Sequence, residues 1–127
     1  MMSKFVGNLV VEVINDDSQG VFKLQNSLTF ISMKTHKTVT APKGFITDFC
    51  SVPWVPGIYE LLGGKARKSG TIHDYLYSKV NTDRIGRSMA DSMLREMVQV
   101  EGVPVWQSWL FYFAVRLFGW HFWQKKK

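Results

Sequence analysis

Two closely spaced prolines divide the sequence into a part that favours strands and a part that favours helices. Pro53 and Pro56 stand in the stretch SVPWVPG. Proline lacks a backbone N–H and has a fixed φ, so this stretch is excluded from the interior of a regular helix or a central strand. We therefore expect a rigid loop that joins a β-rich first part to a helical second part.

Three segments before the prolines have the composition of β-strands. They are LVVEVI, LTFISM and KTVTA, at residues 9–14, 28–33 and 37–41. All three are rich in the β-branched residues that strands favour. The turn cluster INDDSQG at 14–20 separates the first two, and FITDF at 45–49 predicts a further short extended piece. This order indicates a meander of short antiparallel strands.

The second part of the chain has helical periodicity. At most two helical turns are expected in GIYELLGG, at 57–64, before a pair of glycines. Longer helices are predicted over 66–80, 84–102 and 105–123. In the first of these, Ile72 shares its face with Ser69, Leu76 and Val80, while His73 lies at the edge of that face.

The helix predicted at 84–102 carries a charged pair on an apolar side. N-cap candidates precede it at Asn81, Thr82 and Asp83. The residues that repeat every fourth position are Ile85, Met89, Met93 and Met97. Arg87 and Asp91 fall on the side of Leu94 and Val98, which widens this stripe, and not on the polar face of Ser88, Ser92, Arg95 and Gln99. A carboxylate at such an edge requires a partner; Arg87 is one, and another can come from elsewhere in the fold.

The segment 105–123 is almost as long as a membrane span, yet its polar residues favour a buried core helix. It contains one formal charge, Arg116, and polar or small residues interrupt the apolar run. The Trp-rich end followed by Lys125–Lys127 also suits a membrane interface. The whole pattern nevertheless disfavours membrane contact through 105–127.

Length and composition indicate one folded domain of the α+β class. The 127 residues are 46% hydrophobic, which suits a globular core and not a disordered chain. We expect a single domain over 1–127, with a strand-rich part (1–50), a helical part (57–123) and a basic tail (124–127).

Charge and cysteine content exclude few functions. The net charge of +6 comes with no nucleic-acid recognition motif, so it predicts a basic surface and not a specific nucleic-acid site. One cysteine permits no internal disulfide, and the first residues do not resemble a signal peptide.

Six polar residues in apolar surroundings form the candidate site. They come from the loop and from two helices: Asp48, Ser51, His73, Asp74, Arg87 and Asp91. One reading is a divalent metal site of unknown identity, because imidazole and carboxylates are suitable ligands for an ion that activates water. Its ligands would be Asp48, His73, Asp74 and Asp91. No zinc-binding spacing such as HExxH or CxxC supports zinc in particular.

Two other readings of the same residues stay open. In metal-free chemistry, Ser51 or Cys50 would be the nucleophile, His73 the base, and Asp48 or Asp91 the group that orients it. In a purely structural reading, the loop residues cap a turn, His73 is a hydrogen-bonded core residue, and Arg87 and Asp91 are an ordinary i,i+4 pair.

Four linked motifs resemble one known family. They are PKGFITDFCSVP, TIHDYLY, RSMADSMLREMVQVEGVPVW and AVRLFGWHFW, in this order over roughly residues 40–123. They resemble the family catalogued as domain of unknown function one-three-five-three, whose members are small proteins common in tailed bacteriophages and prophages. The polar positions that the family pattern implies are Thr47, Asp48, Ser51, His73, Asp74, Tyr77, Arg87 and Asp91. Cys50 departs from the usual alanine, which argues against a cysteine nucleophile. The resemblance also implies that the last helix is a fixed part of the domain that carries Arg116 inward or to a cleft.

The resemblance implies an origin but no activity. Our first functional hypothesis is a small bacteriophage or prophage hydrolase, with Asp48, Ser51, His73, Arg87 and Asp91 as the catalytic set and a divalent metal as cofactor. The alternative is a non-enzymatic virion, tail or accessory protein whose polar cluster only stabilises the fold. The partners would be an unknown substrate or other phage proteins, in the host cytoplasm or in the virion.

Overall fold

The computed structural model describes residues 2–15, 21–47, 66–78, 85–121 and 123. Strands precede helices in this part of the chain, which confirms the α+β class. The strands are β1 (Lys4–Val6), β2 (Val11–Asn15), β3 (Val21–Leu24), β4 (Leu28–Ser32), β5 (Lys37–Ala41) and β6 (Ile46–Thr47). The helices are α2 (Arg67–Tyr77), α3 (Arg87–Val100) and α4 (Val105–Phe118), followed by the 3₁₀ turn η1 (Gly119–His121).

The strands form two antiparallel sheets and not one continuous meander. One sheet has the order β1-β4-β5 and the other has the order β2-β3-β6. The predicted strands correspond to β2, β4, β5 and β6. The sequence did not predict β1 and β3, since three or four residues give too short a pattern to detect. β1 is a strand because Lys4 to Val6 pair with Ile31 to Thr29 of β4.

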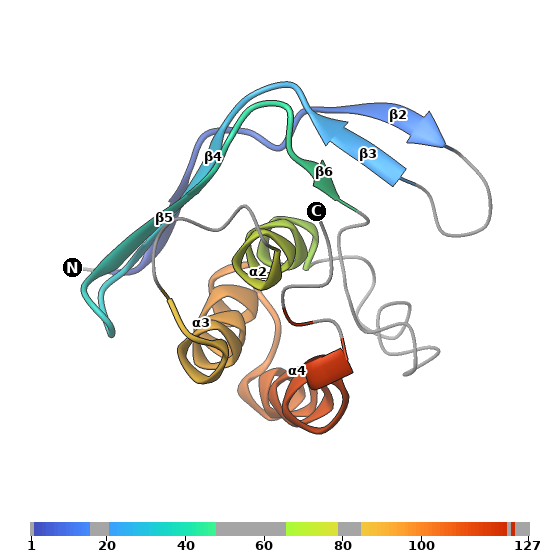
Figure 1. Cartoon of the computed structure of the whole chain (residues 1–127). Coiled ribbons are helices and arrows are strands. Elements are labelled where there is room, and N and C mark those ends of the chain that lie inside the picture. Colours follow the sequence, from blue (N-terminus) through green and yellow to red (C-terminus); the bar gives the residue numbers. More distant parts are fainter. Residues whose placement is uncertain (1, 16–20, 48–65, 79–84, 122, 124–127) are drawn as a thin grey trace.

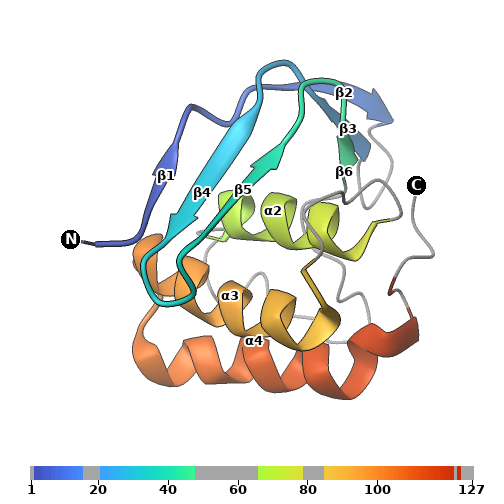
Figure 2. The same ribbon diagram turned by 60° about the vertical axis from the view of Figure 1, so that its left-hand side comes forward.

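The helices are stacked below the sheets in the views of Figures 1 and 2. α2 lies directly under the strands and packs against β4, β5 and β6, and α3 packs against both α2 and α4. α4 lies farthest from the sheets (Figure 2). Consequently, α3 has protein on both sides, whereas α4 has it mainly on one.

The core lies where the alternating pattern of the strands meets the helical pattern. Leu28, Phe30 and Ser32 of β4 are buried, and the residues between them are only half-buried, as expected for a strand with one covered face. Fully buried helix residues that complete this core include Ile72, Leu76, Met93, Met97, Phe111 and Val115.

The beginning and one core position of α3 differ from the sequence prediction. The helix begins at Arg87 with Gly86 as its N-cap, so the proposed caps at 81–83 are wrong; residues 79–84 themselves lie outside the described part. Met89 is exposed rather than buried. A strict four-residue repeat drifts around a helix of 3.6 residues per turn, so Met89 leaves the covered side, and the neighbouring Ala90 is buried there.

Helix α2 obtains its N-terminal cap from α3. Its own N-cap residue, Ala66, makes no side-chain capping bond. Instead, Oε1 of Glu101, at the end of α3, accepts hydrogen bonds from the backbone N–H and the hydroxyl of Ser69, at 2.7 and 2.6 Å. A carboxylate here satisfies N–H groups that have no partner inside the helix and lies at the positive end of its dipole.

A buried carboxylate ties α3 to a sheet. Glu96 accepts hydrogen bonds from the hydroxyls of Ser3 and Ser32, the latter at 2.7 Å from Oε1. The sequence pattern does not distinguish Glu96 from the other charged residues of this amphipathic helix.

The last helix is not the buried core helix that the sequence favoured. α4 ends at Phe118, and only one of its faces is covered. Large apolar side chains on the other face are exposed, among them Trp106 and Leu117. Among the described residues, no helix is long and apolar enough to cross a membrane.

Candidate functional site

The Asp91 carboxylate is the centre of a buried polar cluster that joins three helices. His73 and Tyr77 come from α2, Arg87 and Asp91 from α3, and Arg116 from the last turn of α4. We call these five residues the Asp91 cluster. His73 and Tyr77 are four residues apart on one helix, as are Arg87 and Asp91, so each pair projects from a single helix face.

Both Asp91 oxygens are engaged. Oδ1 lies 2.9 Å from Nε2 of His73 and accepts a 2.5 Å hydrogen bond from the Tyr77 hydroxyl. Oδ2 accepts a 3.0 Å hydrogen bond from Nη1 of Arg116, and Nε of Arg87 lies 3.9 Å away. The carboxylate is fully buried, so its charge is held by protein donors and not by water.

Arg87 holds the cluster and α4 together. Its Nε donates to the Tyr77 hydroxyl at 3.2 Å, and its Nη2 donates to the carbonyl oxygens of Val115 and Arg116, each at 2.8 Å. These carbonyls belong to the last turn of α4, where a cation meets the negative end of the helix dipole. The predicted pairing of Arg87 with Asp91 is therefore present, but the shorter contacts of Arg87 go to other partners.

The cluster shifts the pKa values of two members in opposite directions. Burial by itself raises the pKa of Asp91. The hydrogen bond of His73, the positive charge of its ring when protonated, and the hydrogen bonds of Tyr77 and Arg116 outweigh burial and lower that pKa below the ordinary 3.8. Burial, followed by the hydrogen bond to Asp91 and its negative charge, raises the pKa of Tyr77 above the ordinary 10.0. Asp91 is thus held ionised and Tyr77 neutral.

The contact with Asp91 fixes the proton on one imidazole nitrogen of His73. An ionised carboxylate only accepts hydrogen bonds, so Nε2 must carry the proton that it donates to Oδ1. In the neutral ring, Nδ1 then has the free lone pair. Among the described residues, no hydrogen-bond partner of Nδ1 is found. The ring is 2% exposed and lies against Tyr77, with ring centroids 4.3 Å apart.

The described residues do not by themselves make a metal site. Among them, no group of three or more His, Cys, Asp or Glu side chains is placed to hold an ion. The expectation of a cation rested on an excess of carboxylates, but Arg87 and Arg116 both lie beside Asp91. Asp91 would have to give up existing contacts to bind a metal directly.

The structure brings together three of the six predicted site residues. These are His73, Arg87 and Asp91. Asp74 is buried on α2, but adjacent helix residues diverge by about 100°, so its side chain leaves the helix in a different direction from that of His73. Asp48 and Ser51, with Cys50, lie outside the described residues.

Comparison with known proteins places the chain in one family. The model of the family described as "Protein of unknown function (DUF1353)" matches residues 22–115. The chain belongs to this family. No curated protein and no solved structure matches it. In this DUF1353 protein the matched segment contains four members of the Asp91 cluster and ends one residue before the fifth, Arg116.

The sequence contained a signal for Arg116, a partner of Asp91 that is not among the six predicted site residues. Arg116 is the single formal charge between residues 105 and 123, and such a charge in an apolar helix requires a partner. The family resemblance implied its inward orientation, but not that Asp91 receives it. In this DUF1353 protein, Tyr77 was likewise predicted as a site residue only from the family resemblance. A tyrosine near an apolar face is common in a protein core and does not by itself indicate a site.

Proposed function

We propose that this protein is a small hydrolase in which His73 transfers protons and Asp91 orients its ring. The observation that carries the proposal is the 2.9 Å contact between Nε2 of His73 and Oδ1 of Asp91. A buried carboxylate that fixes the tautomer of a histidine is the arrangement by which hydrolases hold a general base. The hydrogen bonds that Tyr77 and Arg116 donate to Asp91 keep its carboxylate ionised and fix its position.

In the proposed reaction, Nδ1 of His73 accepts a proton from the attacking hydroxyl, and the oxygen bonds to the carbonyl or phosphoryl centre. The imidazolium then returns this proton to the leaving group as the scissile bond breaks, so the ring ends as it began. The attacking hydroxyl belongs to water or to Ser51. With Ser51, the group is first transferred to the serine oxygen, and a water molecule deprotonated by His73 in the same way then breaks this bond and releases the product. A peptide, a cell-wall fragment and a nucleotide remain the substrate classes to test.

In this proposal Arg87, Tyr77 and Arg116 are positioning residues. They hold Asp91 and the end of α4, and Asp91 acts through His73. A metal-dependent version would use Nδ1 of His73 as a ligand with Asp91 behind it, which is how a carboxylate commonly supports a metal-binding histidine. Asp48 and Asp74 would be the other candidate ligands.

The test compares His73→Asn with His36→Asn. His36 is exposed in the turn between β4 and β5 and has a positive φ of 57°, which asparagine tolerates. Purified proteins are assayed against ester, phosphodiester, peptide and cell-wall substrates, with the metal content measured by mass spectrometry and folding by circular dichroism. We expect His73→Asn to lower turnover by about 100-fold or more while remaining folded, and His36→Asn to behave as the wild type.

Each outcome of this test has a definite meaning. A folded His73→Asn protein with full turnover would refute the role of His73. A stoichiometric divalent metal that only His73→Asn loses would favour the metal-dependent version. No hydrolysis of any substrate class by the wild type would favour the second candidate below.

The second candidate is a non-enzymatic bacteriophage or prophage protein, such as a virion, tail or accessory component. The observation that favours it is the pair of bonds from Arg87 to the last-turn carbonyls of α4, because they give the Asp91 cluster a role in holding three helices together. The family resemblance supports the phage origin for both candidates. This candidate predicts a large loss of stability in cluster variants and no activity to lose.

A further inference from the structure

The outer face of α4 is a contiguous apolar surface that the rest of the described protein leaves uncovered. We define it by five side chains: Trp106, Trp109, Leu110, Phe113 and Leu117. Trp106, Phe113 and Leu117 are 63%, 54% and 65% exposed. Single exposed apolar residues are normal, but a continuous patch of this kind marks a surface that binds something.

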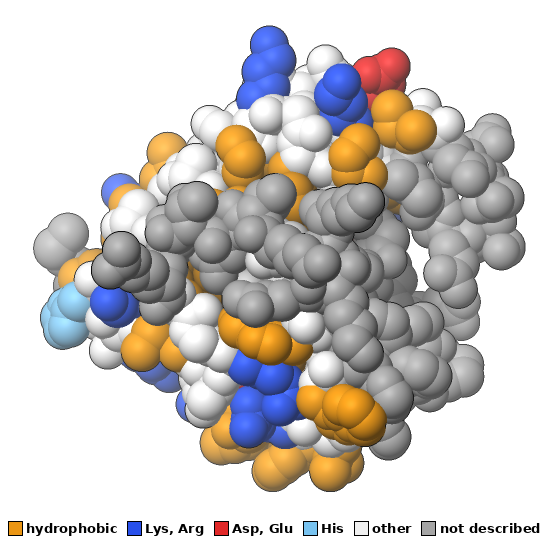
Figure 3. All heavy atoms as spheres, viewed as in Figure 1, with side chains coloured by type: hydrophobic (Ala, Val, Ile, Leu, Met, Phe, Trp, Pro, Cys, Tyr) orange, Lys and Arg blue, Asp and Glu red, His pale blue; other side chains and the backbone are white. Residues whose placement is uncertain are grey.

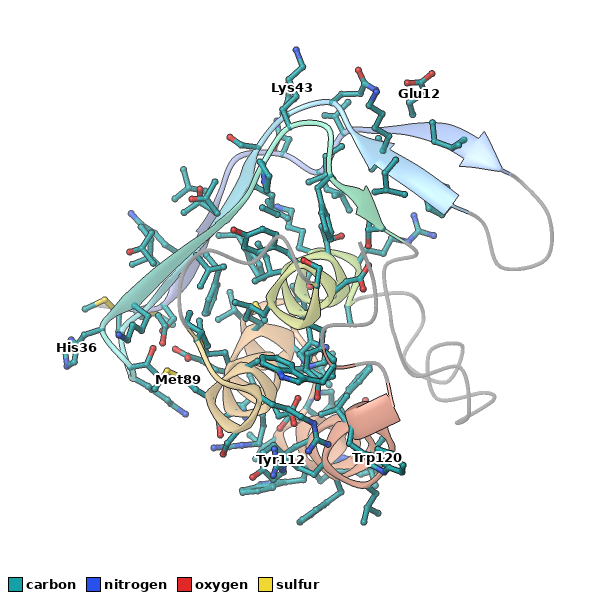
Figure 4. All side chains as sticks on the ribbon, viewed as in Figure 1. Glu12, His36, Lys43, Met89, Tyr112 and Trp120 are labelled. Atoms are coloured by element: carbon teal, nitrogen blue, oxygen red, sulfur yellow. The ribbon has the colours of Figure 1, made fainter. Side chains whose placement is uncertain are left out.

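The face is continuous because of helix geometry. On a helical projection its members fall within an arc of roughly 100°. The opposite side carries Phe111, Ala114 and Val115, which are buried against the core. Figure 3 shows hydrophobic side chains gathered at the lower end of the molecule, with Lys and Arg side chains beside them. In Figure 4, side chains project outward from α4 near the labelled Tyr112 and Trp120.

The part of the sequence that forms this face contains basic residues and no acidic ones. No Asp or Glu occurs after Glu101, whereas Arg116 lies within α4 and Lys125–Lys127 end the sequence. The guanidinium carbon of Arg95 lies 4.2 Å from the ring centroid of Trp109, so a cation from α3 borders the face directly. The whole chain has a net charge of +6.

We propose that the outer face of α4 docks on an anionic lipid surface. Tryptophan with phenylalanine and leucine on one side of a helix, bordered by basic residues, is the pattern of a helix that lies in a membrane interface. The positive border complements anionic headgroups. A second copy of the chain would instead bring another charge of +6 toward the same basic surface.

The proposed helix lies on the membrane and does not cross it. α4 has 14 residues, about 21 Å at 1.5 Å per residue, against a hydrocarbon core of about 30 Å. This mode departs from the sequence expectation, which assumed that the apolar residues of 105–123 face the core. Because the outer face of α4 is exposed, that assumption is wrong.

The test measures sedimentation of the full chain with vesicles. One set contains equal parts phosphatidylglycerol and phosphatidylcholine, and the other contains phosphatidylcholine alone. The test variant is Trp106→Ser/Phe113→Ser/Leu117→Ser, whose side chains are mostly exposed, so that its folding is expected to survive. The control is Val13→Thr/Ile14→Thr, which alters two similarly exposed apolar residues of β2. Circular dichroism checks that both variants are folded, and light scattering after size-exclusion chromatography gives their oligomeric state.

We expect the wild type and the control to bind the anionic vesicles, and the binding to weaken in high salt. The triple variant should bind at least about tenfold more weakly, because less apolar area enters the interface. Absence of wild-type binding to anionic vesicles, or equal binding by the folded triple variant, would overturn the proposal. A wild-type dimer that the triple variant loses, without vesicle binding, would assign the face to a second copy and overturn it as well.

Discussion

Gly119 leaves the space that the Tyr77 hydroxyl occupies. A Cβ atom built on Gly119 would lie 2.6 Å from the Tyr77 oxygen and 3.1 Å from Cε2 of its ring. The glycine has an ordinary helical φ of −68°, so the requirement is for space and not for a special backbone conformation. Tyr77 cannot easily move, because it is fully buried and hydrogen-bonded to Asp91.

Gly119→Ala should therefore lower the free energy of unfolding by about 2 kcal/mol, as expected for overpacking of a filled core. Urea denaturation followed by circular dichroism measures this change. Gly86→Ala is the matched control, since its added Cβ meets nothing within 4 Å, and it should cost less than about 1 kcal/mol. Equal losses in the two variants would contradict the packing explanation.

Asp91→Asn should be among the more destabilising single substitutions in this protein. The asparagine keeps the size of the side chain but removes the negative charge that faces Arg87 and Arg116. We expect a loss of about 3 kcal/mol in the free energy of unfolding, because partly buried cations remain without their counter-ion. Glu12→Gln, the same chemical change at an exposed site, should alter it by less than about 0.5 kcal/mol. Similar values for both would show that the cluster does not stabilise the fold.

The free energy of unfolding should fall in acid because Asp91 becomes protonated. The folded-state pKa of Asp91 is below its ordinary value of 3.8, so below that pH the unfolded chain takes up the proton first. The stabilisation is complete above pH 3.8 and is lost as the pH falls through the lowered pKa, with a slope of up to about 1.4 kcal/mol per pH unit. Urea denaturation at a series of acidic pH values should show a shallower decline in Asp91→Asn than in the wild type. Parallel declines would contradict this assignment.

The free energy of unfolding should also fall in alkali because Tyr77 loses its phenolic proton. The pKa of Tyr77 is raised above 10.0 in the folded protein, so above pH 10 the unfolded chain loses the phenolic proton first. The stabilisation is complete below pH 10 and is lost as the pH rises toward the folded-state pKa. The difference in tyrosinate absorbance at alkaline pH between wild type and Tyr77→Phe isolates this group. A difference that already appears by pH 10 in the folded protein would show that Tyr77 is not held neutral.

Local sequence patterns predicted where the helices and strands lie in the chain. They were less successful in predicting which elements contact each other. The β-branched segments and the apolar repeat from Ile85 to Met97 gave four strands and α3, because these signals reside in adjacent residues. The division into two sheets depends instead on pairings such as that of Lys4 with Ile31. The exposure of Trp106 was also missed, because composition does not tell whether an apolar side faces the core or solvent.

The candidate site shows the same limit. Asp91 was identified because a carboxylate stood at the edge of an apolar stripe, and Arg87 followed from its position one turn earlier. The contact of Asp91 with Arg116 joins α3 to α4, and no spacing within one helix predicts it. The sequence also gave no means to choose between His73 and Asp74, since the orientation of α2 decides which side chain meets Asp91.

The cap on α2 links the order of events in folding to the chain topology. Ser69 receives its capping carboxylate from Glu101, which lies 32 residues later in the sequence. A nascent chain that ends before Glu101 therefore lacks the group that closes the first turn of α2. Helix nucleation is costly, so this helix should become persistent only once α3 has been made and has docked, and the two helices should form as one cooperative unit.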